Sequence, residues 1–147
     1  MIKRKRIFAI TLLIALFIQS TICIAATKST EMGVSVSGTS TRTLTGSYSK
    51  LVAYVDKASI YGKVTNNTNN SRYITVSTTR YKNGVADGTR SNNAGVVSGG
   101  DTISSGGVVR VSTTAYSYYV TCTVYNSVSS STGAVDGLTF KITQNGN

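Results

Sequence analysis

The 147-residue chain contains no histidine, which removes the commonest general base and the commonest metal ligand from its chemistry. Without an imidazole, neither a Ser-His nor a Cys-His nucleophile pair can form, and most hydrolase mechanisms are excluded. Acidic residues are few as well: there are five, and four of them lie at predicted strand ends or turns, where aspartate ordinarily stabilises the turn (Asp56, Asp87, Asp101 and Asp136). We therefore expect no catalytic carboxylate pair, no metal site, no cofactor and no enzymatic activity.

Cysteine is almost as scarce, with Cys23 and Cys122 as the two examples. Loss of an N-terminal segment containing Cys23 would leave Cys122 alone, so no intramolecular disulfide could form. In an alternating stretch Cys122 shares the parity of Val120 and Val124, which predicts a small, buried, free thiol. An intermolecular disulfide or a reactive thiol is the alternative.

Long hydrophobic runs are lacking except at the N-terminus. Residues 3–6 are all basic, and residues 7–18 are apolar apart from Thr11. This pattern is typical of the n- and h-regions of a secretory signal peptide. Small residues follow, so we expect cleavage after Ala25, with Ala26 as the alternative site.

The N-terminal run is a poor match to other membrane-directed segments. A membrane-spanning helix needs about 20 apolar residues, and this run is shorter. Lipidation is disfavoured because the bulky Ile22 directly precedes Cys23. We therefore expect a helical signal peptide at residues 1–25, cleaved near Ala25, a secreted or cell-surface protein, and no membrane span after cleavage.

Positive charge exceeds negative charge, although the signal segment accounts for part of the excess. The chain has 15 Lys and Arg against 5 Asp and Glu, and four of the basic residues lie at residues 3–6. The rest of the chain keeps eleven basic residues against five acidic ones, a net charge of +6. A basic exported protein favours anionic partners, but the dispersed lysines and arginines argue against specific nucleic-acid binding.

Bulky apolar residues are sparse at residues 26–47, where Ser, Thr and Gly dominate. Such a segment buries too little surface to offset its ordering entropy, so we interpret it as a flexible leader. Met32, Val34 and Val36 alternate, which would allow one edge strand. Residues 48–147 are long enough for a single folded domain.

The domain is predicted to be all-β, because apolar and polar residues alternate throughout it and no helical spacing is found. Turns are expected at the Asn-rich residues 66–71, which predict a hairpin between their flanking strands, and at Asn83-Gly84. Six or seven short strands favour an antiparallel β-sandwich of Ig-like or jelly-roll-like type, with a small β-barrel as the alternative. The strands are expected near residues 50–56, 58–65, 73–79, 94–98, 109–111, 118–126 and 138–143.

Tyrosines supply the candidate binding surface. Several occupy the strand parity opposite the aliphatic residues, interleaved with Ser, Thr and Lys, which predicts a polar face that bears aromatic rings. Such rings suit sugars or a protein partner, whereas the alternative interpretation is cross-strand pairing that only stabilises a sheet, or a second buried face. The candidate binding residues, including three nearby cations, are Tyr61, Lys63, Arg72, Tyr73, Arg80, Tyr119 and Tyr125.

Taken together, these features favour a secreted, non-catalytic, bacterial binding protein that acts by binding or assembly at the cell surface or in the extracellular matrix. Expected partners are an anionic cell-wall polymer, a polysaccharide, another protein, or further copies of the chain. One alternative is an antimicrobial or toxin-like protein that acts on anionic cell envelopes. Another is a fibre or matrix subunit in which residues 26–47 add a strand to a neighbour.

Overall fold

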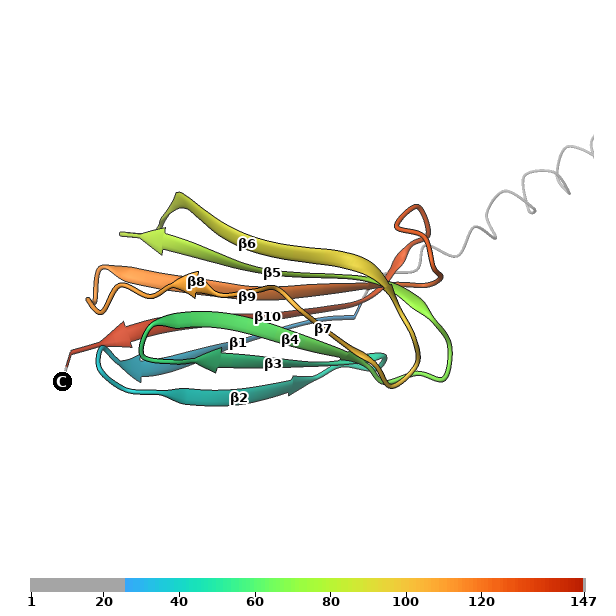
Figure 1. The fold of residues 1–147 in the computed structure, drawn as a ribbon, viewed down its shortest axis with the longest axis horizontal. Helices are drawn as coiled ribbons and strands as arrows, with labels where there is room; N and C mark the ends of the chain where they lie inside the picture. The colour runs from blue at the N-terminus through green and yellow to red at the C-terminus, as the bar shows by residue number, and fades with distance from the viewer. Residues whose placement is uncertain (1–25, 147) are drawn as a thin grey trace, which may run out of the picture.

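The computed structural model describes residues 26–146, and the predicted signal peptide at residues 1–25 lies outside this described part. Residues 26–146 form ten β-strands and no helix (Figure 1). The strands make two sheets of five strands each, so the all-β sandwich is confirmed and the chain does not close into a barrel.

We call the two layers sheet A and sheet B. Sheet A has the order β1-β10-β9-β5-β6, and sheet B has the order β2-β3-β4-β7, with β8 also paired to β4. Sheet A consists of β1 (Ala26–Ser35), β10 (Ala134–Asn145), β9 (Tyr116–Tyr125), β5 (Arg72–Lys82) and β6 (Val85–Val97). Sheet B consists of β2 (Ser40–Thr45), β3 (Ser49–Val55), β4 (Ser59–Asn66), β7 (Thr102–Ser104) and β8 (Val108–Val109).

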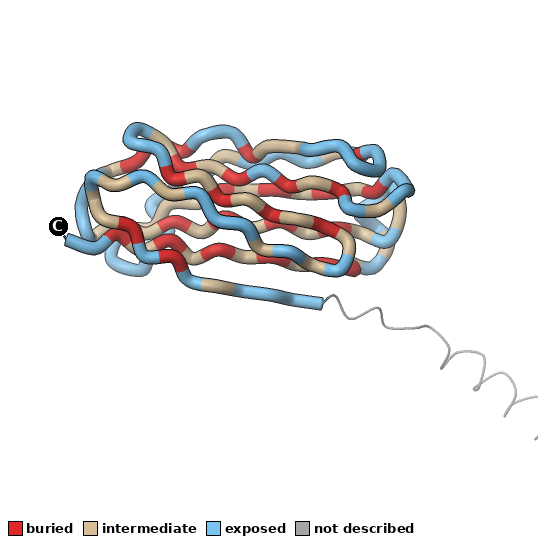
Figure 2. Tube along the Cα trace, turned by 90° about the horizontal axis from the view of Figure 1, so that it is seen from below, coloured by how far each residue is buried: buried red, intermediate tan, exposed pale blue. Residues whose placement is uncertain are grey.

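The hydrophobic core lies between the two sheets. Along the central strands every second residue is buried, as the alternating colours in Figure 2 show, because successive side chains of a strand point to opposite faces. Among the side chains that fill the core without exposure are Leu51 and Val64 of sheet B and Ile74 and Val120 of sheet A. Burial of this apolar surface is the main stabilising contribution to the fold.

The strand count exceeds the six or seven predicted. The largest difference is β6, which runs over 13 residues where only residues 94–98 were expected to pair. It is an edge strand of sheet A, and most of its residues are exposed. An edge strand with little buried surface needs no apolar alternation, so the pattern that predicts the central strands is absent from it.

The segment interpreted as a flexible leader that could hold one edge strand forms two edge strands of the sandwich, so the leader interpretation is corrected. Residues 26–35 form β1, which pairs in parallel with β10 from Ala26↔Asp136 to Ser35↔Asn145. Residues 40–45 form β2, antiparallel to β3. Ladder hydrogen bonds with distant strands, together with burial of Met32 and Val34, order a segment that could not order itself.

The predicted hairpin across residues 66–71 is also wrong. Strand β4 belongs to sheet B and β5 to sheet A, so residues 67–71 cross between the layers. The buried Asn66 holds this crossing: its side-chain nitrogen donates to the carbonyl oxygens of Asn70 (2.8 Å) and Val97 (2.9 Å). The turn composition was recognisable, but composition does not say which strands a turn joins.

The second predicted turn is a true hairpin turn. It joins β5 to β6, and both of its central residues have positive φ, 49° at Asn83 and 80° at Gly84. Two residues in the left-handed region match the twist of antiparallel strands, which explains the Asn-Gly pair at this place.

Asp136 is not the turn residue predicted from its sequence context. It is fully buried in β10, beside a register shift between Ala134 and Asp136. Its carboxylate accepts hydrogen bonds from the backbone N–H groups of Tyr48 (2.9 Å) and Ser49 (3.0 Å) and from the Ser49 hydroxyl (2.9 Å). A Cβ at Gly46 would lie 2.1 Å from this carboxylate, so glycine is required there. Asp136 therefore ties the β2–β3 turn of sheet B to sheet A.

Arg110 does the same at the opposite end of the sandwich. It is buried, and its Nε donates to the side-chain oxygen of Gln144 at 2.7 Å. Its Nη atoms donate to the carbonyl oxygens of Ser35 (2.7 Å), Gly38 (2.5 Å) and Asp56 (3.0 Å). Because Ser35 ends β1, and Gly38 and Asp56 belong to the loops that follow β1 and β3, one guanidinium holds both loops in place.

Candidate binding surfaces

The predicted binding residues do not gather on one face. Tyr61 and Lys63 lie on the outer face of sheet B, whereas Tyr73, Tyr119 and Tyr125 lie on the outer face of sheet A. Strand parity distinguishes outward from inward positions, but it does not say to which of two sheets a strand belongs. The molecule therefore has two candidate surfaces on opposite faces.

The outer face of sheet B carries an aromatic stack. Tyr54 of β3 and Tyr61 of β4 are direct cross-strand partners, and their rings stack with centroids 4.8 Å apart and planes 7° apart. The Lys63 ammonium lies 5.4 Å from the Tyr54 centroid and 6.0 Å from the Tyr61 centroid, within the range of cation–π attraction. The three side chains make one flat aromatic surface with a positive charge at its side.

The surroundings of this stack are polar and basic. Lys50 and Val52 of β3 and Thr65 of β4 share the outer face, and the Thr65 hydroxyl is hydrogen-bonded to that of Thr102 in β7 at 2.8 Å. None of the five strands of sheet B contains an aspartate or glutamate. The charged side chains at outward positions of β3 and β4 are therefore both lysines, Lys50 and Lys63.

The outer face of sheet A is nearly neutral and rich in hydroxyl groups. Two tyrosine pairs lie on it: Tyr73 and Tyr125 meet edge to face with centroids 5.8 Å apart, and Tyr81 and Tyr119 are tilted with centroids 4.8 Å apart. Serine and threonine side chains of β5 and β9 occupy the rows between these pairs.

Two of the three charged side chains at outward positions of this face are paired with each other, and the third is Arg90 on the edge strand β6. Lys141 of β10 forms an ion pair with Glu31 of the neighbouring β1. Glu31 raises the pKa of Lys141 by accepting a hydrogen bond from its ammonium group. This pairing leaves the face without the positive excess of sheet B.

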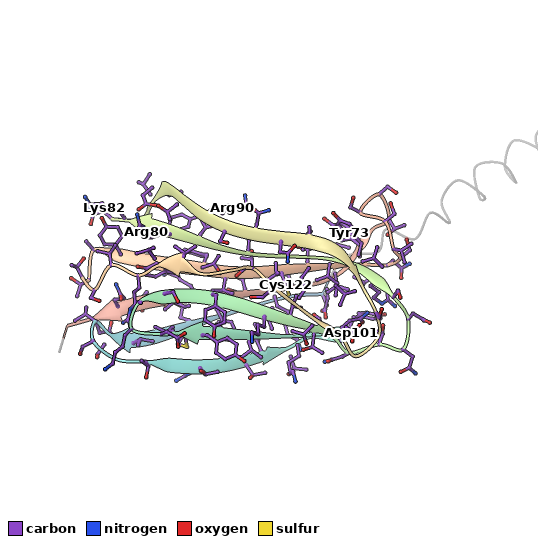
Figure 3. All side chains as sticks on the ribbon, viewed as in Figure 1. Tyr73, Arg80, Lys82, Arg90, Asp101 and Cys122 are labelled. Carbon is purple, nitrogen blue, oxygen red and sulfur yellow. The ribbon has the colours of Figure 1, made fainter. Side chains whose placement is uncertain are left out.

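Two of the predicted cations occupy inward-facing positions of β5 and belong to neither surface. Figure 3 shows that Tyr73, the neighbour of Arg72, and Arg80 lie near opposite ends of this strand. Arg72 is only 9% exposed; it donates to the carbonyl oxygen of Tyr125 (3.3 Å), and its guanidinium lies 4.7 Å from the Tyr48 ring centroid. We exclude Arg72 from the candidate surfaces because its hydrogen bonds and ring contact are internal.

Arg80 is engaged within the chain as well. Its Nε lies 2.6 Å from the Asp87 carboxylate, and its Nη1 donates to the carbonyl oxygen of Val109 at 3.2 Å. The pKa of Asp87 is lowered, first by the hydrogen bond from the Thr89 backbone N–H and also by Arg80. Arg80 links β5 to β6 beside their hairpin turn and is therefore not a free cation for a ligand.

Cys122 is the buried free thiol that was predicted. It is 3% exposed, and it lies between the sheets (Figure 3). Burial raises the pKa of the thiol to about 12. Since the thiolate is the reactive form, the native protein keeps this cysteine inert near neutral pH.

Two residues of these surfaces were not among the candidates predicted from the sequence. Tyr54 and Tyr81 complete two of the ring pairs. Tyr54 lies at the parity opposite Leu51, Ala53 and Val55 in a strand that was predicted correctly, so the rule that selected Tyr61 would have selected it too. Tyr81 lies where the alternation of buried and half-buried residues in β5 weakens. Only the pairing of β5 with β9 shows that Tyr81 lies on the outer face beside Tyr119.

Within residues 26–146, no group of three or more Cys, Asp or Glu side chains could hold a metal ion, and no helix is long and apolar enough to cross a membrane.

Comparison with known proteins shows no family. No family model and no curated protein matches the chain. Among solved structures, a β-glucuronidase from glycoside hydrolase family 2 is similar over 74% of this chain and 11% of its own, with 15% identity and a TM-score of 0.38. A likeness this distant carries no argument about what the chain binds or does.

Proposed function

We propose that this chain is an exported, non-catalytic binding protein whose sheet B face binds an anionic polymer of the cell surface. The observation that carries the proposal is the Tyr54–Tyr61 stack beside Lys63, on a sheet whose strands contain no acidic residue. Export is supported by the signal-like pattern of residues 1–25, and a non-catalytic role by the absence of histidine.

The chemistry of the face suits a wall polymer that has both sugar or polyol units and negative charges. The stacked rings offer an apolar surface with hydroxyl groups at its rim, which is complementary to a ring or an alkyl backbone. Lys63 and Lys50 attract phosphate or carboxylate groups, and their attraction is strongest at low ionic strength. The positive charges of this face are spread out and do not form a tight cluster. A polymer with repeating charges therefore fits the face better than a single small anion.

The test measures binding of the chain from residue 26 onward to immobilised teichoic acid and, in parallel, to an uncharged dextran. We expect salt-sensitive binding to teichoic acid, weakened several-fold by Lys63→Ala and by Tyr61→Ala. Arg90→Ala is the matched control, because it removes one exposed charge from sheet A. An equal effect of Lys63→Ala and Arg90→Ala would show that only net charge matters, and absence of binding would overturn the proposal. Leakage of dye from anionic vesicles would instead support the envelope-active alternative.

Assembly by strand exchange is a second candidate, favoured by the character of β1. Apart from Met32 and Val34, every residue of this edge strand is exposed or half-buried, and its ladder is with β10 alone. A second copy could supply an identical strand to β10 and restore the same ladder, and the exchange requires the loop after Ser35, which Arg110 holds, to open.

Strand exchange can be tested with cysteines at register partners. Ser29 of β1 and Thr139 of β10 are opposite each other on the outer face. If chains exchange β1, mixing the single variants Ser29→Cys and Thr139→Cys under oxidising conditions yields a disulfide-linked heterodimer. The double variant, which closes within one chain, is the control for geometry. Monomers alone in the mixture would rule the exchange out.

A further inference from the structure

We propose that the outer face of sheet A is a second, separate binding surface, which takes an uncharged polysaccharide chain lying along β5 and β9. This proposal does not depend on the function proposed for sheet B. Together, the two faces would let one molecule bridge a neutral glycan and an anionic polymer.

The two tyrosine pairs lie at opposite ends of the same two strands. Tyr125 and Tyr119 of β9 are six residues apart, which in an extended strand is about 20 Å. The Tyr73 ring meets the Tyr125 ring edge to face, and the Tyr81 ring lies tilted against the Tyr119 ring. Each pair therefore forms an aromatic platform, and the separation of the platforms matches an extended chain of several sugars rather than one sugar.

Hydroxyl groups fill the rows between the platforms. In the ladder between β5 and β9, Thr75 is opposite Thr123 and Ser77 is opposite Thr121. Ser77 and Thr121 are hydrogen-bonded to each other at 2.8 Å, which orients both hydroxyls while leaving each able to make a further hydrogen bond. Thr139 of β10 continues the Thr121 row. A sugar chain offers the matching groups, since its hydroxyls both donate and accept.

Charge decides between a neutral and an anionic ligand on this face. Lys141 is paired with Glu31, and the other outward cation, Arg90, lies on the edge strand β6. A polyanion would find its countercharge on sheet B instead. The neutral face of sheet A is complementary to an uncharged chain, because ring stacking and hydroxyl hydrogen bonds require no net charge.

The low aliphatic content of the face argues against an obligate protein interface. Stable protein interfaces have a fully buried apolar core surrounded by a polar rim. Within residues 26–146, the large hydrophobic side chains that are well exposed are Val85, Val96, Val109 and Val128. Of these, Val96 is the one at an outward ladder position on sheet A, and it lies on the edge strand β6, away from the centre of the face.

The test is native electrophoresis of the chain from residue 26 onward in gels that each contain one neutral polysaccharide. The four polysaccharides are β-glucan, mannan, xylan and glycol chitin. We expect at least one of them to retard the protein, and its oligosaccharides to bind with an affinity that rises steeply between disaccharide and hexasaccharide. Tyr119→Ala should weaken hexasaccharide binding about ten-fold, because one ring contact is lost. It should also abolish the rise in affinity with oligosaccharide length. Thr121→Val, which keeps the side-chain shape, should weaken binding at all lengths.

Controls separate this proposal from the one for sheet B and from misfolding. Tyr61→Ala should leave glycan binding unchanged, and Tyr119→Ala should leave teichoic acid binding unchanged. Tyr119→Phe keeps the ring and should retain most of the affinity. Equal melting temperatures of the Tyr119→Ala and Tyr119→Phe variants would exclude loss of folding as the cause of the weaker binding. Absence of retardation in all four gels, or affinity independent of oligosaccharide length, would overturn the inference.

Discussion

Individual buried polar residues hold this sandwich together at its ends. Asp136, Arg110 and Asn66 each hydrogen-bond to loops that sequence patterns treat as simple turns. A buried polar side chain stabilises the fold only while its partners are in place, and removal of one member leaves the others unsatisfied. Single substitutions at such residues therefore have effects out of proportion to their size.

Asp136→Asn is expected to destabilise the protein by about 2–4 kcal/mol, because the new amide group turns a donor toward the donors of Tyr48 and Ser49. Urea denaturation followed by circular dichroism measures the change. Asp101→Asn, at an exposed loop residue, is the control and should change the stability little. A loss as small as that of the control would show that the carboxylate is not needed.

Cys122 should not react with Ellman's reagent at pH 8 in the native protein and should react fully in urea. The thiol pKa of about 12 lies above the reference value of 9.0, so the folded state disfavours the thiolate. The free energy of unfolding depends on pH for the same reason. The stabilisation from the protonated Cys122 thiol is complete below pH 9 and is lost as the pH rises toward 12. Rapid reaction of the native protein would contradict the burial of Cys122.

At the scale of elements, edge strands are the part of this fold that sequence patterns miss. Central strands such as β3 and β9 bury alternate residues and show this clearly. The edge strands β1, β2 and β6 bury few residues and are ordered by backbone pairing with a neighbour. Their order is therefore a property of the assembled sheets rather than of their own composition.

Met32→Ala tests whether β1 is an integral part of the fold. Met32 is 1% exposed in the core, so its truncation should cost about 2–5 kcal/mol and lower the melting temperature clearly. Ser29→Ala, at an exposed position of the same strand, should change it little. If both variants melted like the unchanged chain, β1 would be a loosely attached leader after all.

At the scale of the whole molecule, the two sheets approach each other closely at Gly62. Gly62 of β4 lies against Val120 of β9, and a Cβ at Gly62 would be 2.3 Å from the Val120 Cγ1 atom. No side chain fits there unless the two sheets separate or Val120 changes its rotamer.

Gly62→Ala is therefore expected to destabilise the sandwich by about 1–3 kcal/mol through overpacking. Gly95→Ala is the matched control on edge strand β6, where a Cβ meets nothing within 4 Å and stability should be unchanged or slightly higher. Thermal unfolding of both variants gives the comparison. Equal melting temperatures would mean that the sheets adjust freely at Gly62.

The amino-acid sequence by itself determined the fold class, the central strands, the Asn83-Gly84 turn and the burial of Cys122. These depend on local alternation and turn chemistry, which the order of residues contains directly. Only the tertiary structure decided that residues 26–35 and 40–45 are both strands, that residues 67–71 cross between layers, and that the tyrosines divide between two opposite faces. The physical reason is the same in each case, because strand pairing and sheet membership come from contacts between residues far apart in the chain, and no local pattern contains them.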